Sequence, residues 1–215
     1  LQAYGLDVFI PSTPQEAYNH ILYMNKNNVP SVMLEHRYLT QIKQKFKLTD
    51  NVKKPYNAKF YPSKKKSKIL LITYADTLID ALKAKKILKQ NNIDVSILNF
   101  SYFSNKNKID QKFIKLLNNY DNLLFIDSAP FEFGILSGLM SIINLNIKDK
   151  SKYFYLSPPN IPAAASAYVS KDYYVDINDI IKKCCLILNK KIIKKIDLTF
   201  DQKILWPNDN IEELY

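Results

Sequence analysis

Residues 68–100, KILLITYADTLIDALKAKKILKQNNIDVSILNF, decide the fold. Residues 68–73 form an apolar run of strand length, and residues 95–100 form a second one. Between them, residues 77–90 place apolar side chains at a spacing close to 3.6 residues, which predicts a helix. A strand, a helix and another strand in this order indicate two parallel strands joined by a helical crossover.

The alternation continues toward the carboxyl end of the chain. The pattern predicts helices over 110–118, 134–145 and 176–188, and strands over 123–127 and 152–156. Alternating strands and helices are typical of an α/β domain with a mostly parallel sheet that helices cover on both faces. A stiff loop rich in proline and small residues follows the last strand, over 157–166.

A partial α/β segment precedes this domain. Residues 6–10 read as a strand, and Thr13 and Glu16 with Pro14 between them form a capping box that starts a helix ending near Met24 or Lys26. Residues 31–35 read as a buried strand. Because one helix and two strands bury little surface, residues 1–39 are interpreted as the end of a larger domain, whose beginning we expect to lie before Leu1.

Two stretches show no regular period. Residues 40–67 are rich in lysine and include Pro55 and Pro62, which indicates a linker on the surface. Residues 190–215 are predicted to be a surface tail that Trp206 and Pro207 hold in place. We therefore divide the chain into residues 1–39, 40–67, 68–189 and 190–215.

Charge and composition exclude several classes of protein. The net charge of +11 comes from scattered lysines, without interleaved aromatic residues that would stack on bases, so a solvated surface is favoured over nucleic-acid binding. No apolar run approaches the ~20 residues of a membrane span. The glycine-rich, nucleophilic and zinc-binding motifs of common enzyme classes are missing from the sequence.

The cysteines and histidines give no metal signature. Cys184 and Cys185 are adjacent, so we expect two buried helix thiols in a reducing compartment, with a cytoplasmic location. His20 is expected to be a half-buried or surface histidine. The two histidines and two cysteines lack the spacing of a zinc site.

The strongest candidate cluster is Glu35, His36 and Arg37, directly after a predicted strand. Arg37 is the single arginine of the chain, and its planar guanidinium has five donors that a lysine cannot reproduce. At the carboxyl end of a strand, the cluster is either a ligand site or subunit contact, or an exposed ion pair of little energetic value. Asp127 also closes a strand, and Gly134 follows either for close packing or for an approach to a ligand.

Five segments together resemble a known family. They are GLDVFIPSTPQEA at 5–17, PSVMLEHRYL at 30–39, residues 68–99, LLFIDSAPFEFGILSG at 123–138 and PPNIPAAASAYVSKDYY at 158–174. In this order they are similar to the transketolase-like, thiamine-diphosphate-dependent enzymes. The likeness is greatest to the beta subunit of the first component of 2-oxo acid dehydrogenases, such as pyruvate dehydrogenase.

The resemblance implies a three-layer α/β/α domain over 68–189, preceded at 1–39 by the end of a pyrimidine-binding domain. It implies thiamine diphosphate and Mg²⁺ in the full enzyme, bound mainly outside this chain, with the activating glutamate and the active-site histidine upstream. No catalytic or cofactor-binding residue is therefore assigned here. The implied partners are subunits of a homodimer or α/β heterotetramer, and an acyltransferase core; the full enzyme would be an oxidoreductase or a transferase.

The resemblance also places residues at an interface or at the rim of the active site: Glu35, His36, Arg37, Asp127, Gly134 and Asp172. Three departures from the family pattern stand out. Ser128 and Ala129 replace a Glu-Gly pair, Asp172 stands where related members carry histidine, and Asn27 replaces an aspartate that helps to hold a monovalent cation. Whether the chain holds a metal is left open. The alternatives are a non-catalytic assembly module and the C-terminal part of a 1-deoxyxylulose-5-phosphate synthase-like enzyme.

Overall fold

The chain folds as a mixed α/β protein in a computed structural model. The structure describes residues 5–48, 58–104, 111–146, 152–163, 165–166, 170, 172–191 and 210–214. The helices, including two short 3₁₀ turns η1 and η2, are α1 (Pro14–Lys26), η1 (Arg37–Gln41), α2 (Thr77–Gln90), α3 (Gln111–Leu117), α4 (Ile135–Asn144), α6 (Ile177–Ile187) and η2 (Ile211–Leu214). The strands are β1 (Asp7–Phe9), β2 (Ser31–Met33), β3 (Ala58–Tyr61), β4 (Ile69–Tyr74), β5 (Val95–Phe100), β6 (Tyr102–Ser104), β7 (Asn122–Ile126) and β8 (Lys152–Leu156).

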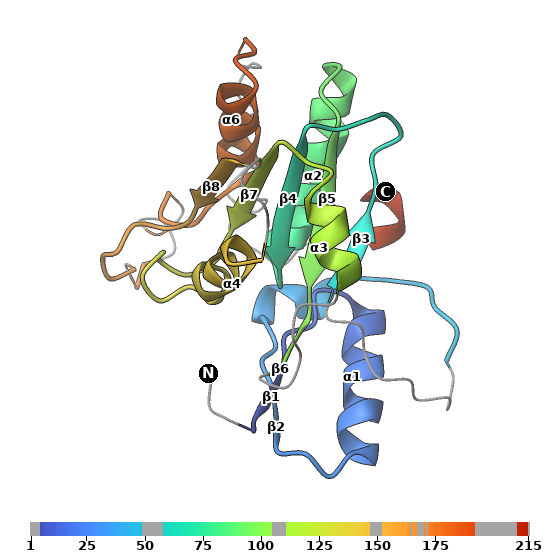
Figure 1. The fold of residues 1–215 in the computed structure, drawn as a ribbon. Helices are drawn as coiled ribbons and strands as arrows, with labels where there is room; N and C mark the ends of the chain where they lie inside the picture. Colours follow the sequence, from blue (N-terminus) through green and yellow to red (C-terminus); the bar gives the residue numbers. More distant parts are fainter. Residues whose placement is uncertain are drawn as a thin grey trace.

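The larger sheet has five strands in the order β3-β5-β4-β7-β8. β4 pairs in parallel with both β5 and β7, and β7 pairs in parallel with β8. β3 closes one edge in antiparallel orientation against β5. The predicted mostly parallel sheet is confirmed, and its carboxyl edge faces the first segment of the chain (Figure 1).

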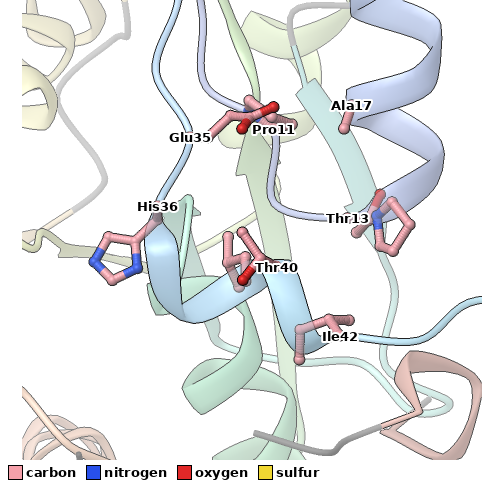
Figure 2. Close-up of a pocket in the computed structure, with 9 residues that line it drawn as sticks. Pro11, Thr13, Ala17, Glu35, His36, Thr40 and Ile42 are labelled. Atoms are coloured by element: carbon pink, nitrogen blue, oxygen red, sulfur yellow. The ribbon is translucent and has the colours of Figure 1, made fainter. Parts of the chain in front are cut away.

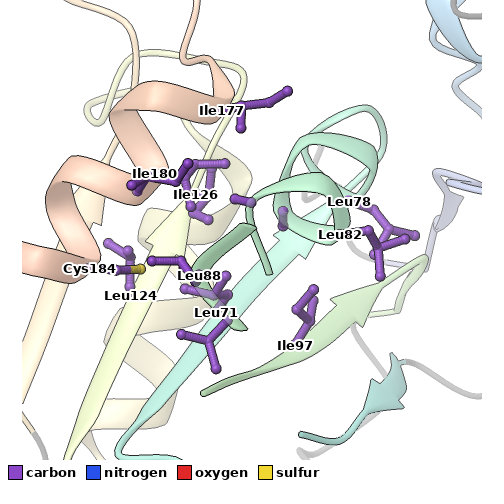
Figure 3. Packing of buried hydrophobic residues seen from close by; sticks show 14 of the residues in the cluster. Leu71, Leu78, Leu82, Leu88, Ile97, Leu124, Ile126, Ile177, Ile180 and Cys184 are labelled. Carbon is purple, nitrogen blue, oxygen red and sulfur yellow. The ribbon is translucent and has the colours of Figure 1, made fainter. Parts of the chain in front are cut away.

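Two hydrophobic layers cover the sheet, which gives the predicted three-layer arrangement. On one face, Leu71, Ile97 and Leu124 pack against α2 and α6 (Figure 3). On the other face, Leu70, Leu98 and Phe125 and their neighbours pack against α3 and α4. The strands are buried on both sides, as their continuous apolar sequences predict.

The first segment forms a small sheet in the order β2-β1-β6. β1 and β2 are parallel, whereas β6 is antiparallel to β1 and continues from β5 after the single residue Ser101. One stretch of chain therefore supplies a strand to each sheet. The rings of Phe9 and Tyr102 stack across this junction with centroids 4.6 Å apart.

Several expectations for this region need correction. β3 lies inside residues 40–67, where no strand was predicted, and it gains its partners from the edge of the larger sheet. β2 is half-buried rather than buried, because it is the outer strand of a three-stranded sheet. His20 is 2% exposed rather than half-buried or on the surface, because α1 packs it against Phe9.

The end of the chain is also less peripheral than predicted. Ile211 in η2 is fully buried against the face that carries α2, and its amide donates to Lys43 O. The predicted anchors Trp206 and Pro207 lie outside the described residues, as do all of residues 192–209 and the residues before Gly5. Cys184 and Cys185 are free and buried in α6, as expected, and burial raises the pKa of Cys184 to about 12.

Candidate functional site

The Asp127 carboxylate lies at the carboxyl end of β7 and joins three strands. Its Oδ1 accepts from Tyr74 Oη of β4 at 2.6 Å, and its Oδ2 accepts from Tyr155 Oη of β8 at 2.6 Å. The amides of Ala129 and Leu136 donate to the same two oxygens, at 2.9 and 3.0 Å. A carboxylate with four donors is well satisfied even though Asp127 is fully buried.

The tyrosines are protonated donors in this arrangement. Burial is the largest cause that raises the pKa of both Tyr74 and Tyr155 well above the usual range, and the adjacent Asp127 carboxylate adds to it. Neither hydroxyl is therefore suited to act as a base near neutral pH. The cluster holds the ends of β4, β7 and β8 together.

Gly134 is required by close packing at the start of α4. It is the N-cap residue, with φ −70°, so its backbone conformation is open to any residue. A Cβ at this position would lie 2.4 Å from Asp127 Oδ2 and 2.6 Å from Tyr155 Oη. Of the two interpretations from the sequence, close packing is therefore the one that the geometry favours.

A second polar cluster joins the first segment to the same edge. His36 Nε2 lies 3.8 Å from Asp76 Oδ2, and Ser128 Oγ donates to Asp76 Oδ1 at 2.8 Å. Asp76 is placed by Ala75, a buried residue in the left-handed region at φ +49°. Non-glycine residues adopt this conformation rarely, and such positions concentrate at functional sites.

The predicted site residues do not all meet. His36, Asp127 and Gly134 lie at the carboxyl edge of the larger sheet. His36 contacts Asp76, which accepts from Ser128, and Gly134 packs against Asp127. Glu35 is exposed beside His36, whereas Arg37 begins the η1 turn, where its carbonyl accepts from Thr40 Oγ1. Asp172 is exposed in the turn before α6 and is not among the groups that contact the Asp127 carboxylate.

A pocket of about 200 Å³ lies between the start of α1 and the η1 turn (Figure 2). One wall of the pocket comes from the start of α1 and the other from the η1 turn and the residues beside it. The lining residues are Pro11, Thr13, Pro14, Ala17, Glu35, His36, Leu39, Thr40 and Ile42. The lining is mainly apolar, and Glu35 and His36 are the ionisable residues among those that line it. This composition suits an apolar group with one polar end.

The half-buried Glu16 and the buried Ser12, Thr73 and Asn99 join α1 to the larger sheet. Glu16 Oε2 accepts from the Ser12 amide at 2.8 Å, and Asn99 Nδ2 donates to Glu16 Oε1 at 3.4 Å. Asn99 Oδ1 in turn accepts from Ser12 Oγ and from Thr73 Oγ1. Burial raises the pKa of Glu16 to about 7, against the lowering effect of its hydrogen bonds and of Lys59.

Within the described residues, no group of three or more His, Cys, Asp or Glu side chains could hold a metal ion such as Mg²⁺. The Asp127 and Glu16 carboxylates already accept from internal donors. At the position discussed for a monovalent cation, Asn27 Nδ2 donates to Tyr23 O at 2.7 Å and so occupies a terminal carbonyl of α1.

Residues 58–180 match the family model described as the transketolase C-terminal domain, which is more than half of the chain. The chain belongs to the transketolase C-terminal domain family. The match begins at β3. No curated protein sequence matches the chain.

Solved transketolase structures share the fold. One of them, a split-gene transketolase in an inactive β4 tetramer, superposes with a TM-score of 0.63 at 10% identity and covers 86% of this chain. A transketolase mutant from Pichia stipitis superposes with a TM-score of 0.53 at 9% identity, again over 86% of this chain. The chain spans 58% and 25% of the lengths of these two proteins, so it corresponds to part of each.

The sequence did not reveal several residues that form hydrogen bonds or ion pairs at the carboxyl edge of the larger sheet. Tyr74, Tyr155 and Asp76 were not singled out, although each lies at or near the end of a predicted strand. Glu16 was assigned only to the helix cap, and its contact with Asn99 was not foreseen. Polar residues at the ends of the predicted strands indicated a possible site. Which of these residues contact each other depends on the order of the strands in the sheet, which the sequence does not show.

No helix in the described part of the chain is long and apolar enough to cross a membrane.

Proposed function

We propose that this chain is the C-terminal portion of a thiamine-diphosphate-dependent enzyme of transketolase type. Its roles are to assemble subunits and to shape the entrance of an active site that the rest of the protein completes. The family match over residues 58–180 is the observation that carries this proposal. The position of His36, Asp76 and Ser128 at the carboxyl edge supports it, because ligands of open α/β sheets bind at this edge.

The cofactor is proposed to lie mainly outside this chain. When bound, thiamine diphosphate supplies the carbanion chemistry, and protein groups orient it. The chain alone is therefore expected to be inactive.

For the reaction, we propose decarboxylation of a 2-oxo acid within a dehydrogenase, with this chain as part of the beta subunit. The similarity of residues 30–39 and 158–174 to that subunit motivates the choice. Transfer of a two-carbon unit between sugar phosphates is the second candidate, and the two transketolase structures that share the fold favour it. A synthase of the 1-deoxyxylulose-5-phosphate type would combine features of both.

Activity assays on the complete protein with its partner subunit separate these reactions. Release of carbon dioxide from a 2-oxo acid, with reduction of an artificial electron acceptor, is the result expected for a dehydrogenase. Carbon dioxide release that instead accompanies transfer to an aldehyde would indicate the synthase. Two-carbon transfer from a ketose phosphate without carbon dioxide would replace the dehydrogenase assignment with transketolase.

A non-catalytic assembly module is a further candidate. Ser128 and Ala129 stand where the family has a Glu-Gly pair, and the Ser128 hydroxyl is occupied by Asp76. The similar split-gene transketolase forms an inactive β4 tetramer, which motivates the idea that such a chain assembles without catalysis. Complete loss of all three activities in the full protein, with assembly intact, would favour this candidate.

A further inference from the structure

The turn between β7 and α4, together with α4 itself, carries almost no charge. Residues 116–147 contain no lysine or arginine, although the chain has 31 such residues. Each of the other described α-helices carries at least one lysine, whereas α4 has no charged side chain. Between Asp127 and Lys148 the sequence has a single charged residue, Glu132. This stretch is therefore an exception in a chain with a net charge of +11.

The same stretch exposes large apolar side chains. Four of the nine large hydrophobic residues that are exposed in the described part of the chain lie here: Phe131, Phe133, Ile142 and Leu145. Leu145 and Phe133 are 86% and 76% exposed, the two highest values among the nine. Exposed apolar side chains that are grouped in this way mark interaction sites, whereas single ones are common on any surface.

One side of α4 faces the core, and another side carries small and apolar residues. Three apolar residues of α4 are buried against the sheet: Leu136, Leu139 and Ile143. Gly138, Ser141, Ile142 and Leu145 follow the spacing i, i+3, i+4 and i+7, so they share a different face of the helix. Gly138 and Ser141 have small side chains, which allows the axis of a second helix to approach to about 8 Å.

The turn before α4 is held in place by internal contacts. The Asp127 carboxylate accepts from the Ala129 amide at 2.9 Å. The ring of Phe131 packs edge-on against Tyr155, with centroids 4.8 Å apart. Phe133 follows in the same turn and stays largely exposed. Because the turn is already ordered, Phe133 can contact a partner at little cost in conformational entropy.

The charge of the chain indicates which partner fits this surface. An acidic protein or an anionic membrane would be attracted by lysines, which this stretch lacks. Two copies of a chain with a net charge of +11 repel each other, most strongly where lysines would meet. Since α4 contributes no lysine, it is the described α-helix that can pack against its own copy without placing lysine against lysine.

We propose that the turn and α4 bind the same surface of a second copy of this chain. The surface, here called the α4 surface, consists of Phe131, Phe133, Gly138, Ser141, Ile142 and Leu145. This proposal rests on the assembly role proposed above and specifies its partner and its surface. A two-fold axis relates identical surfaces in such a dimer. With the two α4 helices antiparallel, the two Glu132 side chains lie at opposite ends of the contact.

Sedimentation velocity of the chain tests the proposal in about 0.3 M NaCl, which screens the net charge. The expected result is a monomer at about 1 μM and a growing dimer fraction up to about 100 μM, as for a small interface. Leu145→Lys places a positive charge on the α4 surface of each copy, so it should weaken dimerisation at least about tenfold.

Leu186→Lys is the matched control, because Leu186 is an exposed leucine in the last turn of α6. A lysine near the carboxyl end of a helix is compatible with the helix dipole, so both variants should fold. The control should change dimerisation by less than about twofold, since it lies outside the α4 surface. A chain that stays monomeric at about 100 μM, or equal weakening by both substitutions, would overturn the proposal.

A lipid surface is the other occupant that this experiment separates. Cosedimentation of the chain with phosphatidylserine vesicles, lost in Leu145→Lys, would assign the α4 surface to a membrane and overturn the proposal. A dimer that Leu145→Lys leaves intact would also overturn it, while the assembly role would stand. The activity assays on the complete protein decide the reaction separately, because sedimentation reports association alone.

Hydrogen exchange of the unchanged chain supplies a measurement that needs no variant. The α4 amides should exchange at least about threefold more slowly at about 100 μM than at about 1 μM, because the dimer shields them. The α1 amides, outside the proposed contact, should exchange equally at both concentrations. Exchange of α4 that is independent of concentration would contradict the proposed dimer.

Discussion

The Asp127 carboxylate connects β4, β7 and β8 with the start of α4 through hydrogen bonds to side chains and backbone. Its two oxygens face four donors and no acceptor, a geometry that only an ionised carboxylate satisfies fully. Gly134 leaves the room that this approach needs. The residue therefore positions the edge from which Ser128 reaches Asp76, rather than carrying chemistry itself.

The Asp127→Asn variant should lower the free energy of unfolding by about 3 kcal/mol, because the new amide group would face buried donors. Urea denaturation measures the loss. Asp121→Asn is the matched control, since Asp121 is exposed just before the same strand, and it should change stability by less than about 0.5 kcal/mol. Equal effects of the two substitutions would show that the buried cluster contributes nothing.

Gly134→Ala should destabilise the chain by about 2 kcal/mol through overpacking, since the new methyl group would overlap Asp127 and Tyr155. Thermal unfolding measures this effect, with Ser141→Ala on the exposed side of α4 as the control. A stability equal to that of the unchanged chain would mean that the Asp127 carboxylate moves freely to make room.

At the level of elements, α1 begins at a side-chain cap. Thr13 Oγ1 accepts from the Glu16 amide at 3.2 Å, and Thr13 is itself 4% exposed. Thr13→Ala should therefore cost about 1 kcal/mol in urea denaturation. Asn25→Ala, at an exposed position of the same helix, should have no destabilising effect, because alanine favours the helix. A neutral result at Thr13 would show that tertiary contacts alone determine where α1 starts.

The elements show what the sequence could and could not predict. The α2 boundaries follow from a 3.6-residue apolar period, and Thr13 was recognisable as a cap because its partner lies three residues away. β3 carries no such local signal, since it is a short edge strand next to a lysine run and depends on β5 for its hydrogen bonds. The sequence did not predict β6 as a separate strand, because only one residue separates it from β5. In the structure, β6 pairs with β1 in the smaller sheet.

The same limit applies to the candidate site. Asp127, His36 and Gly134 were recognisable from their places after strands and before a helix. Their partners Tyr74 and Tyr155 come from strands on either side of β7, and a local pattern does not reveal which strands are neighbours. The Glu16–Asn99 contact spans 83 residues and depends on how two sheets meet.

At the scale of the whole molecule, the two sheets are linked by β5 and β6, which follow each other along the chain with one residue between them. Side-chain hydrogen bonds that Asn99 makes with Ser12 and Glu16 add a second link. The net charge of +11 is spread over scattered lysines rather than over a stacking surface. We therefore expect no binding to duplex or single-stranded nucleic acid at about 150 mM salt, measured by fluorescence anisotropy. Submicromolar binding at that salt concentration would require a specific basic surface on this chain.

We propose that this chain supplies the C-terminal part of a thiamine-diphosphate enzyme whose cofactor is held mainly elsewhere. Isothermal titration calorimetry of the chain alone, with thiamine diphosphate and Mg²⁺, tests this proposal. The expected result is no binding in the micromolar range, because the Asp127 and Glu16 carboxylates are already engaged. Micromolar binding by the isolated chain would contradict the claim.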